Sequence, residues 1–264
     1  MADTPEQSGD RASQHPQEPP QPGRLICQVE AIEQVTHDIR IVRLRPIDGS
    51  HFHFLAGQYA QLGFDEHEPR DYSMANRPDE AAVEFHIRDS QDGGASSYVA
   101  ESLTMGERVT LDGPYGDSYL RSDHAGDIVA VAGGSGLAPM KSIVEEALAQ
   151  GWESAIDLYF GARTEADLYL LDHFAELERR YRNFRFTPVL SDPQERTQRR
   201  VGMVTDIMAE DLEDASDKKA YLAGPPIMVE AAVALLLKLG ASETDIHADA
   251  FYTEAEKATM QASS

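Results

Sequence analysis

The sequence predicts two consecutive folded units: a six-stranded antiparallel β-barrel, then an α/β unit with a five-stranded parallel sheet. Short segments of alternating apolar and polar residues, separated by Gly and Pro, follow one another from Arg24 to about Ser122, which is typical of barrel strands. From Asp127 onward, unbroken apolar runs alternate with helical stretches. That alternation indicates a parallel sheet covered on both faces.

The first 23 residues contain five prolines and four glutamines and almost no large apolar side chain. Such a segment cannot bury enough surface to offset the entropy lost on ordering, so we expect it to be disordered. The expected division is a tail at 1–23, the barrel at 24–123, the α/β unit at 124–253 and a C-terminal tail at 254–264.

The individual elements follow from periodicity and from the Gly and Pro positions between them. In the barrel, strands are expected at Leu25–Ile32, Asp38–Leu44, Gln58–Phe64, Asp71–Ala75, Ala82–Arg88 and Arg108–Leu111, with one helix near Ser97–Leu103. In the second unit, strands are expected at Ile128–Ala132, Ala155–Phe160, Phe184–Val189, Ala220–Ala223 and Asp245–Ala248. The helices between them are expected at Ala138–Gln150, Leu171–Tyr181, Val204–Glu210 and Pro226–Leu239.

The charge excludes some partners. The 264 residues carry 46 acidic and 23 basic side chains, a formal charge of −23. Nucleic acids and anionic membranes both need clustered Lys and Arg, so neither is expected as a partner. No apolar run approaches the roughly 20 residues of a membrane span, and the N-terminus lacks a signal pattern. We therefore expect a cytoplasmic protein.

The single cysteine, Cys27, rules out an internal disulfide, a cysteine zinc site and a cluster held by four thiolates. The pair His51 and His53 has no third ligand nearby in the sequence, so we expect no bound metal. Any iron–sulfur cluster that works with this protein would lie on another chain.

The strongest local signal is the segment Gly133–Pro139, which follows an apolar strand and opens a helix. Its glycines let backbone amides approach a ligand, and a helix N-terminus attracts a pyrophosphate. The spacing G-G-x-G-x-A differs from the dinucleotide fingerprint G-x-G-x-x-G. By itself the segment favours nucleotide binding, with a packing turn as the alternative.

Two further segments offer the same kind of chemistry, although the barrel segment taken alone favours an ordinary strand with a surface arginine and a glycine turn. In the barrel, Arg70 offers a planar fork for phosphate, and the residues Gly93–Ser97 open the expected helix with backbone amides and the Ser96 hydroxyl. In the second unit, a strand runs into the turn Gly224–Pro226 at the carboxyl edge of the sheet, where such sheets bind their ligands.

Taken together, these segments resemble the ferredoxin–NADP reductase superfamily, and most closely the FAD- and NAD-binding reductase components of bacterial aromatic-ring dioxygenases and related oxygenases, without a fused [2Fe-2S] domain. The resemblance covers about residues 24–253. Its motifs occur in family order at Gly57–Tyr59, Arg70–Ser73, Gly113–Gly116, Gly133–Pro139 and Gly224–Met228.

The resemblance implies a role for each matching residue. Ser73, Asp249 and Phe251 would lie at the flavin ring and are the expected catalytic residues. Binding of FAD is implied for Arg70, Tyr72, Ser73, His86, Ile87, Arg88, Gly94, Ala95 and Ser96. Binding of the nicotinamide cofactor is implied for Gly133, Gly134, Gly136, Gly224, Pro225 and Met228. One position departs from the family, because Ala223 stands where a cysteine is common.

The choice between NADH and NADPH depends on two strand ends. Asp192 would repel a 2′-phosphate and accept a ribose hydroxyl, which favours NADH. Arg163 points the other way, since it could bind that phosphate, so NADPH remains possible.

The resulting hypothesis is an FAD-dependent NADH reductase that passes electrons to a separate [2Fe-2S] ferredoxin or oxygenase component. Two alternatives remain open. One is an NAD(P)H:flavin oxidoreductase that uses flavin as a diffusible substrate. The other is a non-catalytic nucleotide- or FAD-binding regulatory subunit, which only Ala223 supports.

Overall fold

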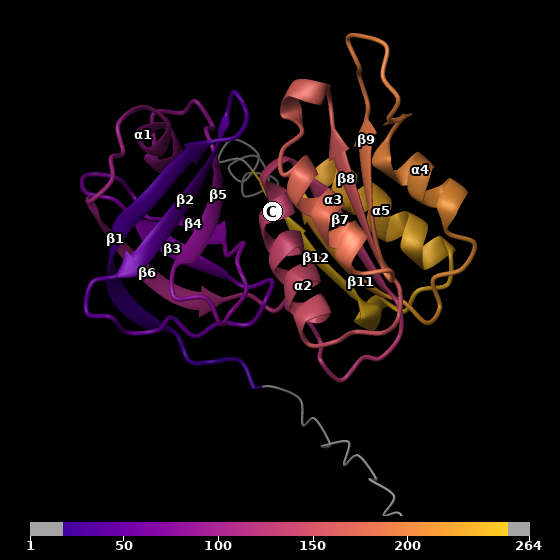
Figure 1. Ribbon diagram of the computed structural model, residues 1–264, viewed down its shortest axis with the longest axis horizontal. Coiled ribbons are helices and arrows are strands. Elements are labelled where there is room, and N and C mark those ends of the chain that lie inside the picture. Colours follow the sequence, from indigo (N-terminus) through magenta and orange to yellow (C-terminus); the bar gives the residue numbers. More distant parts are fainter. Residues whose placement is uncertain (1–17, 253–264) are drawn as a thin grey trace, which may run out of the picture.

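The computed structural model of the protein describes residues 18–252, so the first 17 residues of the expected tail and all of the expected C-terminal tail lie outside the described range. The chain forms a barrel and an α/β domain side by side, as the sequence predicts (Figure 1). Each has its own sheet of six strands.

The barrel consists of one antiparallel sheet in the order β4-β3-β6-β1-β2-β5. A bridge between Met74 and Phe85 joins its two edge strands, so the sheet is nearly closed. Alternate residues point inward, and these build an apolar core that includes Val42, Leu62 and Phe85. The elements of this domain are β1 (Gly23–Gln34), β2 (Ile39–Pro46), β3 (Tyr59–Gly63), β4 (Arg70–Ser73), β5 (Val83–Arg88), α1 (Ala95–Glu101) and β6 (Arg108–Tyr115).

The second sheet is parallel, in the order β10-β9-β8-β7-β11-β12. Its strands are β7 (Ile128–Gly133), β8 (Ile156–Ala162), β9 (Phe184–Leu190), β10 (Arg200–Val201), β11 (Lys219–Gly224) and β12 (Ile246–Ala250). Its helices are η1 (Gly134–Gly136), α2 (Leu137–Ala149), η2 (Glu165–Asp167), α3 (Leu171–Arg180), α4 (Val204–Asp211), α5 (Pro226–Lys238) and η3 (Glu243–Asp245).

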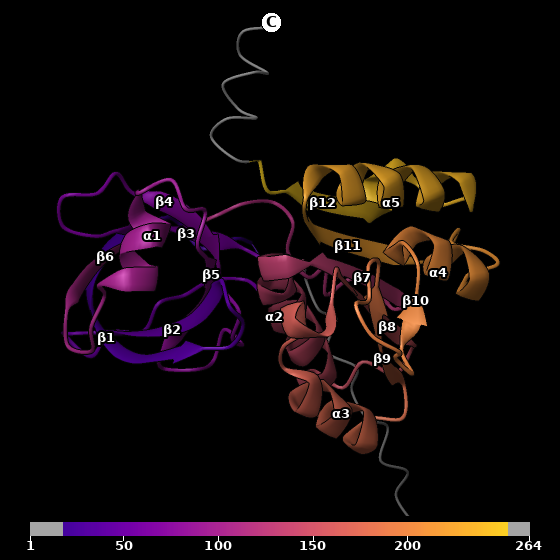
Figure 2. The ribbon, with the colours of Figure 1, turned by 90° about the horizontal axis from the view of Figure 1, so that it is seen from above.

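The helices cover both faces of this sheet, with α2 and α3 on one side and α4 and α5 on the other (Figure 2). The central strands β7 and β11 are buried along nearly their whole length, which explains why their sequences are apolar runs and not alternating patterns. The core under α2 and α3 also contains Ile39, Ala56 and Leu120 of the first unit. The two domains therefore share a packed interface.

The prediction of five strands in the second sheet was wrong, because the sheet has six. The additional strand, β10, pairs with β9 through Arg200 and Val201 alone. Two residues in an Arg-rich segment leave no periodic signal that could have indicated a strand.

None of the described helices combines the length and the apolar character that crossing a bilayer requires. The longest of them, α2 and α5, have 13 residues each, whereas a span needs about 20.

Candidate active site

The glycine-rich turn after β7 is held against the end of β11. A Cβ atom added at Gly136 would lie 2.1 Å from the carbonyl oxygen of Ala223, and one at Gly133 would lie 2.8 Å from both Met228 Sδ and Pro225 Cδ. These contacts leave no room for a side chain. Packing therefore requires glycine at positions 133 and 136, whatever the turn binds.

Helix α2 begins directly after this turn, at Leu137, and its first turn has no acidic residue. The N-terminus of α5 lies at the same edge of the sheet, because Pro225 and Met228 contact Gly133; its first turn is also free of acidic residues. Helix N-termini carry partial positive charge and unpaired amide groups. This edge therefore fits the pyrophosphate of a dinucleotide.

The carboxyl ends of β7, β11 and β12 bring further predicted residues together. Gly224 has a φ angle of +140°, and a Cβ atom there would lie 2.8 Å from the Gly133 carbonyl oxygen. The backbone N–H of Phe251 donates to the Gly224 carbonyl at 2.9 Å. Gly133, Gly224 and Phe251, which are far apart in the sequence, thus meet at one point.

Strand β4 carries Arg70, Tyr72 and Ser73 along the edge of the barrel. Ser73 is buried, and Tyr72 packs against the barrel core. Burial raises the pKa of Tyr72 well above its ordinary value, and the positive charge of Arg70 opposes this shift. The pKa of Asp92 is lowered, chiefly because the N–H of Gly94 donates to it and further by the Arg70 charge. Arg70 is therefore close to both Tyr72 and the glycine turn before α1.

That turn already pairs its own amides. The N–H of Gly93 donates to Ser97 Oγ at 3.2 Å and that of Gly94 to Asp92 Oδ1 at 2.8 Å. The Ser96 hydroxyl lies 2.7 Å from that of Ser90. Ala95 is buried and begins α1, two residues before the expected start.

Strand β5 faces the barrel core with one side and the α/β domain with the other. Ile87 lies in the core cluster, so only its backbone is available to a cofactor. His86 and Arg88 point the opposite way. A Cβ atom added at Gly134 would be 3.4 Å from Arg88 Nη1, which places this arginine against the glycine-rich turn. Arg88 also pairs with Asp38 at 2.7 Å.

His86 is buried and uses both ring nitrogens within the protein. Its Nδ1 lies 3.0 Å from the Tyr169 hydroxyl and its Nε2 lies 3.2 Å from Glu84 Oε1. Burial lowers the pKa of His86, although Glu84 opposes the shift. The sequence could not show that this predicted flavin neighbour faces a buried polar cluster. The signal that was available is Lys141, a charged residue in the otherwise apolar first turns of α2.

Asp249 lies on β12, beside the predicted Phe251. Burial raises the pKa of Asp249, and the negative charge of Asp71 adds to this. Burial and the charges of Asp71 and Asp249 also raise the pKa of Tyr59. Asp249 therefore lies near the β3–β4 edge of the barrel, and Phe251 packs against the core that the two domains share.

Arg163 and Asp192 lie at neighbouring strand ends, after β8 and β9. The N–H of Asp192 donates to the Arg163 carbonyl at 2.8 Å. The side chain of Arg163 is 3.5 Å from Asp167, and that of Asp192 is exposed. Both residues are thus placed to meet one end of a nucleotide bound at this sheet edge.

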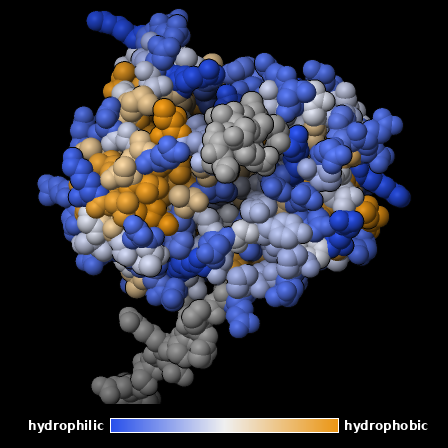
Figure 3. Space-filling model, turned by 180° about the vertical axis from the view of Figure 1, so that it is seen from behind, coloured by the Kyte–Doolittle hydropathy of each residue, from blue (hydrophilic) through white to orange (hydrophobic). Residues whose placement is uncertain are grey.

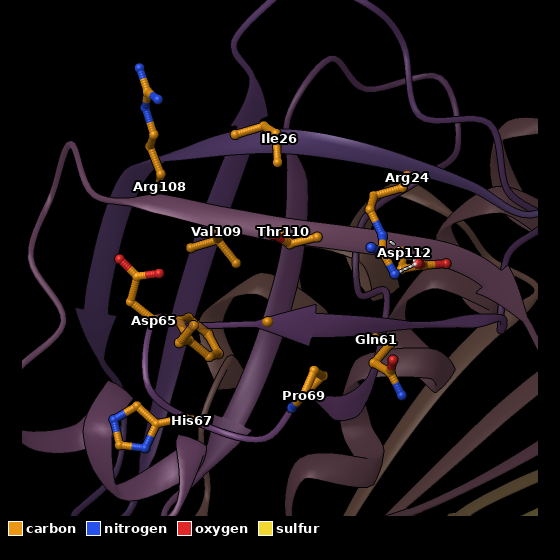
Figure 4. A pocket seen from close by; sticks show the side chains of 12 residues that line it. Arg24, Ile26, Gln61, Asp65, His67, Pro69, Arg108, Val109, Thr110 and Asp112 are labelled. Atoms are coloured by element: carbon orange, nitrogen blue, oxygen red, sulfur yellow. Dashed lines mark hydrogen bonds and ion pairs between the residues drawn. The ribbon is translucent and has the colours of Figure 1, made fainter.

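A groove of about 510 Å³ lies elsewhere, on the outer wall of the barrel between β1, β3 and β6 (Figure 4). The exposed Ile26 supplies apolar surface, and Arg108 and His67 lie at its rim. No predicted cofactor residue lines it. The back of the α/β domain, where α5 lies, carries an apolar patch (Figure 3). Ile227 and Leu237 of α5 are exposed.

Two protein families match the chain in the order of its two domains. Residues 26–119 match the oxidoreductase FAD-binding domain and residues 130–234 match the oxidoreductase NAD-binding domain. One relative is the ferredoxin–NAD(P)⁺ reductase component of the naphthalene 1,2-dioxygenase/salicylate 5-hydroxylase systems of Ralstonia sp. It is 41% identical over 235 residues, and the match covers 88% of this chain and 70% of that protein. The chain belongs to the ferredoxin–NAD(P) reductase components of oxygenase systems.

Other members of this reductase family agree. The reductase component of the naphthalene 1,2-dioxygenase system of Pseudomonas putida is 40% identical over 232 residues, with 88% of this chain and 70% of that protein covered. Among solved structures, the cytochrome P450 reductase GcoB of Amycolatopsis superimposes with a TM-score of 0.82 at 36% identity, covering 87% of this chain and 70% of that one. This reductase is therefore an oxidoreductase with one FAD-binding and one NAD-binding domain.

Proposed function

We propose that this reductase takes a hydride from NADH and delivers the electrons, by way of FAD, to a separate iron–sulfur protein of an oxygenase system in the cytoplasm. The observation that carries this proposal is the meeting of the two predicted cofactor sites. Arg88 of the barrel lies against Gly134 of the glycine-rich turn Gly133–Gly136 (the nucleotide turn). Cofactors held by these two elements would be neighbours, as direct transfer requires.

The protein's own contribution is binding, orientation and exclusion of water. Arg70 and Tyr72 would hold FAD on the barrel edge, with Ser73 at the ring. The turn Gly133–Gly136 and the start of α5 would hold the nicotinamide nucleotide. FAD supplies the redox chemistry when bound, because it accepts two electrons together and releases them one at a time.

We propose a separate acceptor because the single cysteine of these residues cannot hold a [2Fe-2S] cluster. Relatives support the same assignment: the named reductase components serve dioxygenase systems, and others serve propane 2-monooxygenase.

Anaerobic titration of the purified protein with NADH, followed by its visible spectrum, tests the proposal. We expect bound flavin that survives gel filtration and bleaches within seconds. Flavin lost on the column would favour a diffusible flavin substrate, and bound flavin that NADH does not bleach would favour the regulatory subunit. A protein that takes up no FAD would overturn the proposal. Electron delivery is checked by reduction of a [2Fe-2S] ferredoxin, which should require the reductase.

The preference for NADH rests on Asp192, because its carboxylate would face the 2′ position while Arg163 is engaged by Asp167. Asp192→Asn should raise kcat/KM for NADPH about tenfold, which corresponds to about 1.4 kcal/mol, with little change for NADH. Glu195→Gln, an exposed carboxylate three residues further on, is the matched control and should change neither value. Equal effects of the two variants would refute the role of Asp192.

A further inference from the structure

Lys141 is a buried ammonium group at the interface between the two domains. It lies on α2, one turn after the nucleotide turn, and is 7% exposed. Its Nζ lies 3.2 Å from the Ala75 carbonyl, 3.2 Å from Glu145 Oε2 and 3.3 Å from Glu84 Oε1. Two of the three N–H donors of this ammonium group donate to Ala75 and Glu145, and its charge pairs with Glu84. Ala75 and Glu84 belong to the barrel.

The adjacent Ser142 makes a second contact with the same part of the barrel. It is fully buried, and its hydroxyl donates to the Asn76 carbonyl at 2.7 Å. Asn76 is itself fixed, because its side chain donates to the Ala82 carbonyl and accepts from the N–H of Glu84. The segment Ala75–Asn76, which α2 contacts, is therefore held in place by the rest of the barrel. This segment begins two residues after Ser73.

A third contact reaches the nucleotide turn directly. Tyr169 is buried. Its hydroxyl lies 3.0 Å from His86 Nδ1 and donates to the carbonyl oxygen of Gly134 at 3.3 Å. His86 in turn contacts Glu84, the same carboxylate that pairs with Lys141. The nucleotide turn is thus connected to β5 through Tyr169 and His86, and helix α2, which follows the turn, is connected to β5 through Lys141 and Glu84.

The charges in this cluster compensate one another. Glu84 also pairs with Arg43 at 2.7 Å, and Glu145 pairs with His173. Burial alone would lower the pKa of Lys141, but Glu145 and Glu84 raise it above its ordinary value. Removing one partner of such a buried pair is costly and leaves the other uncompensated. The ammonium group is therefore a fixed, charged link between the two domains.

We propose that Lys141 is a positioning residue, which fixes the nucleotide turn relative to Ser73 and so sets how the nicotinamide approaches the flavin. This inference rests on the proposed function above. Lys141 touches neither predicted cofactor site. It acts through α2, which begins directly after the nucleotide turn. The second helical turn of α2 is bonded to the barrel through Lys141 and Ser142.

The test compares Lys141→Met with the wild-type holoenzyme in anaerobic stopped-flow experiments. The limiting rate of flavin reduction at saturating NADH should fall about 10- to 100-fold, because a misplacement of about 1 Å can cost 10²-fold. The long-wavelength charge-transfer absorbance of stacked nicotinamide and flavin should weaken. The Kd values for FAD and for NAD⁺, measured by calorimetry, should change less than about threefold, since the groups that bind them remain.

Lys219→Met is the matched control. Lys219 lies in the same domain, at the start of β11, pairs with Asp245 at 2.8 Å and shares no ion-pair partner with Lys141. Its loss should leave the reduction rate and the charge-transfer band unchanged. If both variants slow reduction equally, or if Lys141→Met leaves the rate unchanged, the positioning role is refuted.

Ser142→Ala keeps the proposal testable should Lys141→Met fail to fold, because it removes only one hydrogen bond. It should lower the limiting rate about threefold with unchanged Kd values, and an unchanged rate would then refute the proposal. A wild-type protein that binds FAD but is not reduced by NADH would instead overturn the proposed function itself. The two failures are thereby distinguished.

Discussion

Two glycine-rich turns in this reductase look alike in sequence but are glycine-rich for different physical reasons. In the turn Gly133–Gly136, Cβ atoms added at Gly133 and Gly136 would run into the start of α5 and the β11 backbone, respectively. In the turn Gly93–Gly94, a Cβ at Gly93 would meet nothing within 4 Å and one at Gly94 only the Asp92 side chain. Packing dictates the first turn. Backbone conformation and ligand access remain as reasons for the second, so substitutions separate the two.

The largest effect is expected for Gly136→Ala. The new methyl group would overlap the backbone of Ala223, which cannot rotate away as a side chain does. We expect a loss of about 3 kcal/mol or more in the free energy of unfolding, measured by urea denaturation. A loss below about 1 kcal/mol would show that the turn and β11 separate easily, and the distinction between the turns would fail.

Gly133→Ala should have an intermediate effect. The nearest atoms are Met228 Sδ and the rigid Pro225 ring, each 2.8 Å from the added Cβ. Methionine can adapt and proline cannot, so about 1–3 kcal/mol of stability should be lost. Calorimetry should also show weaker NAD⁺ binding, because α5 must move. Met228→Ala combined with Gly133→Ala should restore part of the stability, and no recovery would contradict the assigned contact.

A smaller effect is expected for Gly93→Ala, where space is open but φ is +73°. A left-handed conformation costs a residue other than glycine about 1 kcal/mol. Thermal unfolding should therefore shift by a few degrees. Gly93→Asn is the matched control, since asparagine tolerates this conformation better, and it should lose less stability. Equal losses would point to a steric cause instead.

The smallest effect on the fold is expected for Gly94→Ala, under about 0.5 kcal/mol, because only the flexible Asp92 side chain must move. If this turn approaches FAD, the same substitution should weaken FAD binding about tenfold, or about 1.4 kcal/mol. Fluorescence titration of the apoprotein with FAD measures this. Unchanged FAD affinity would leave Gly94 without a binding role.

The strand–turn–helix units could be predicted because local patterns encode them. Gly133–Pro139 combines an apolar strand, glycines and a proline at a helix start, and each signal lies within a few residues. The segment Gly224–Met228 is predicted from the same kind of pattern, a strand that runs into a glycine–proline turn and a helix. Their assembly at one sheet edge follows from the parallel topology, since the carboxyl ends of parallel strands share an edge.

The polar cluster at the interface could not be predicted from local patterns. Alternation along β5 places Glu84 and His86 on one face, but nothing in the sequence shows that Lys141 and Tyr169 cover that face. Such contacts join residues more than 50 positions apart and depend on how the two domains pack. Strand β10 was missed for the opposite reason, because its two residues are too few for any periodicity.

Cys27 has a practical consequence for studying these domains. It is the single cysteine of the sequence and is fully buried in the barrel core. Burial, together with the charge of Asp48, raises the pKa of its thiol to about 12, so alkylating reagents should not reach it. Cysteines introduced at two exposed positions, one on each domain, would then be the sole labelling sites. Cys27 therefore need not be replaced before fluorescent or spin labels at these positions are used to measure the distance between the domains.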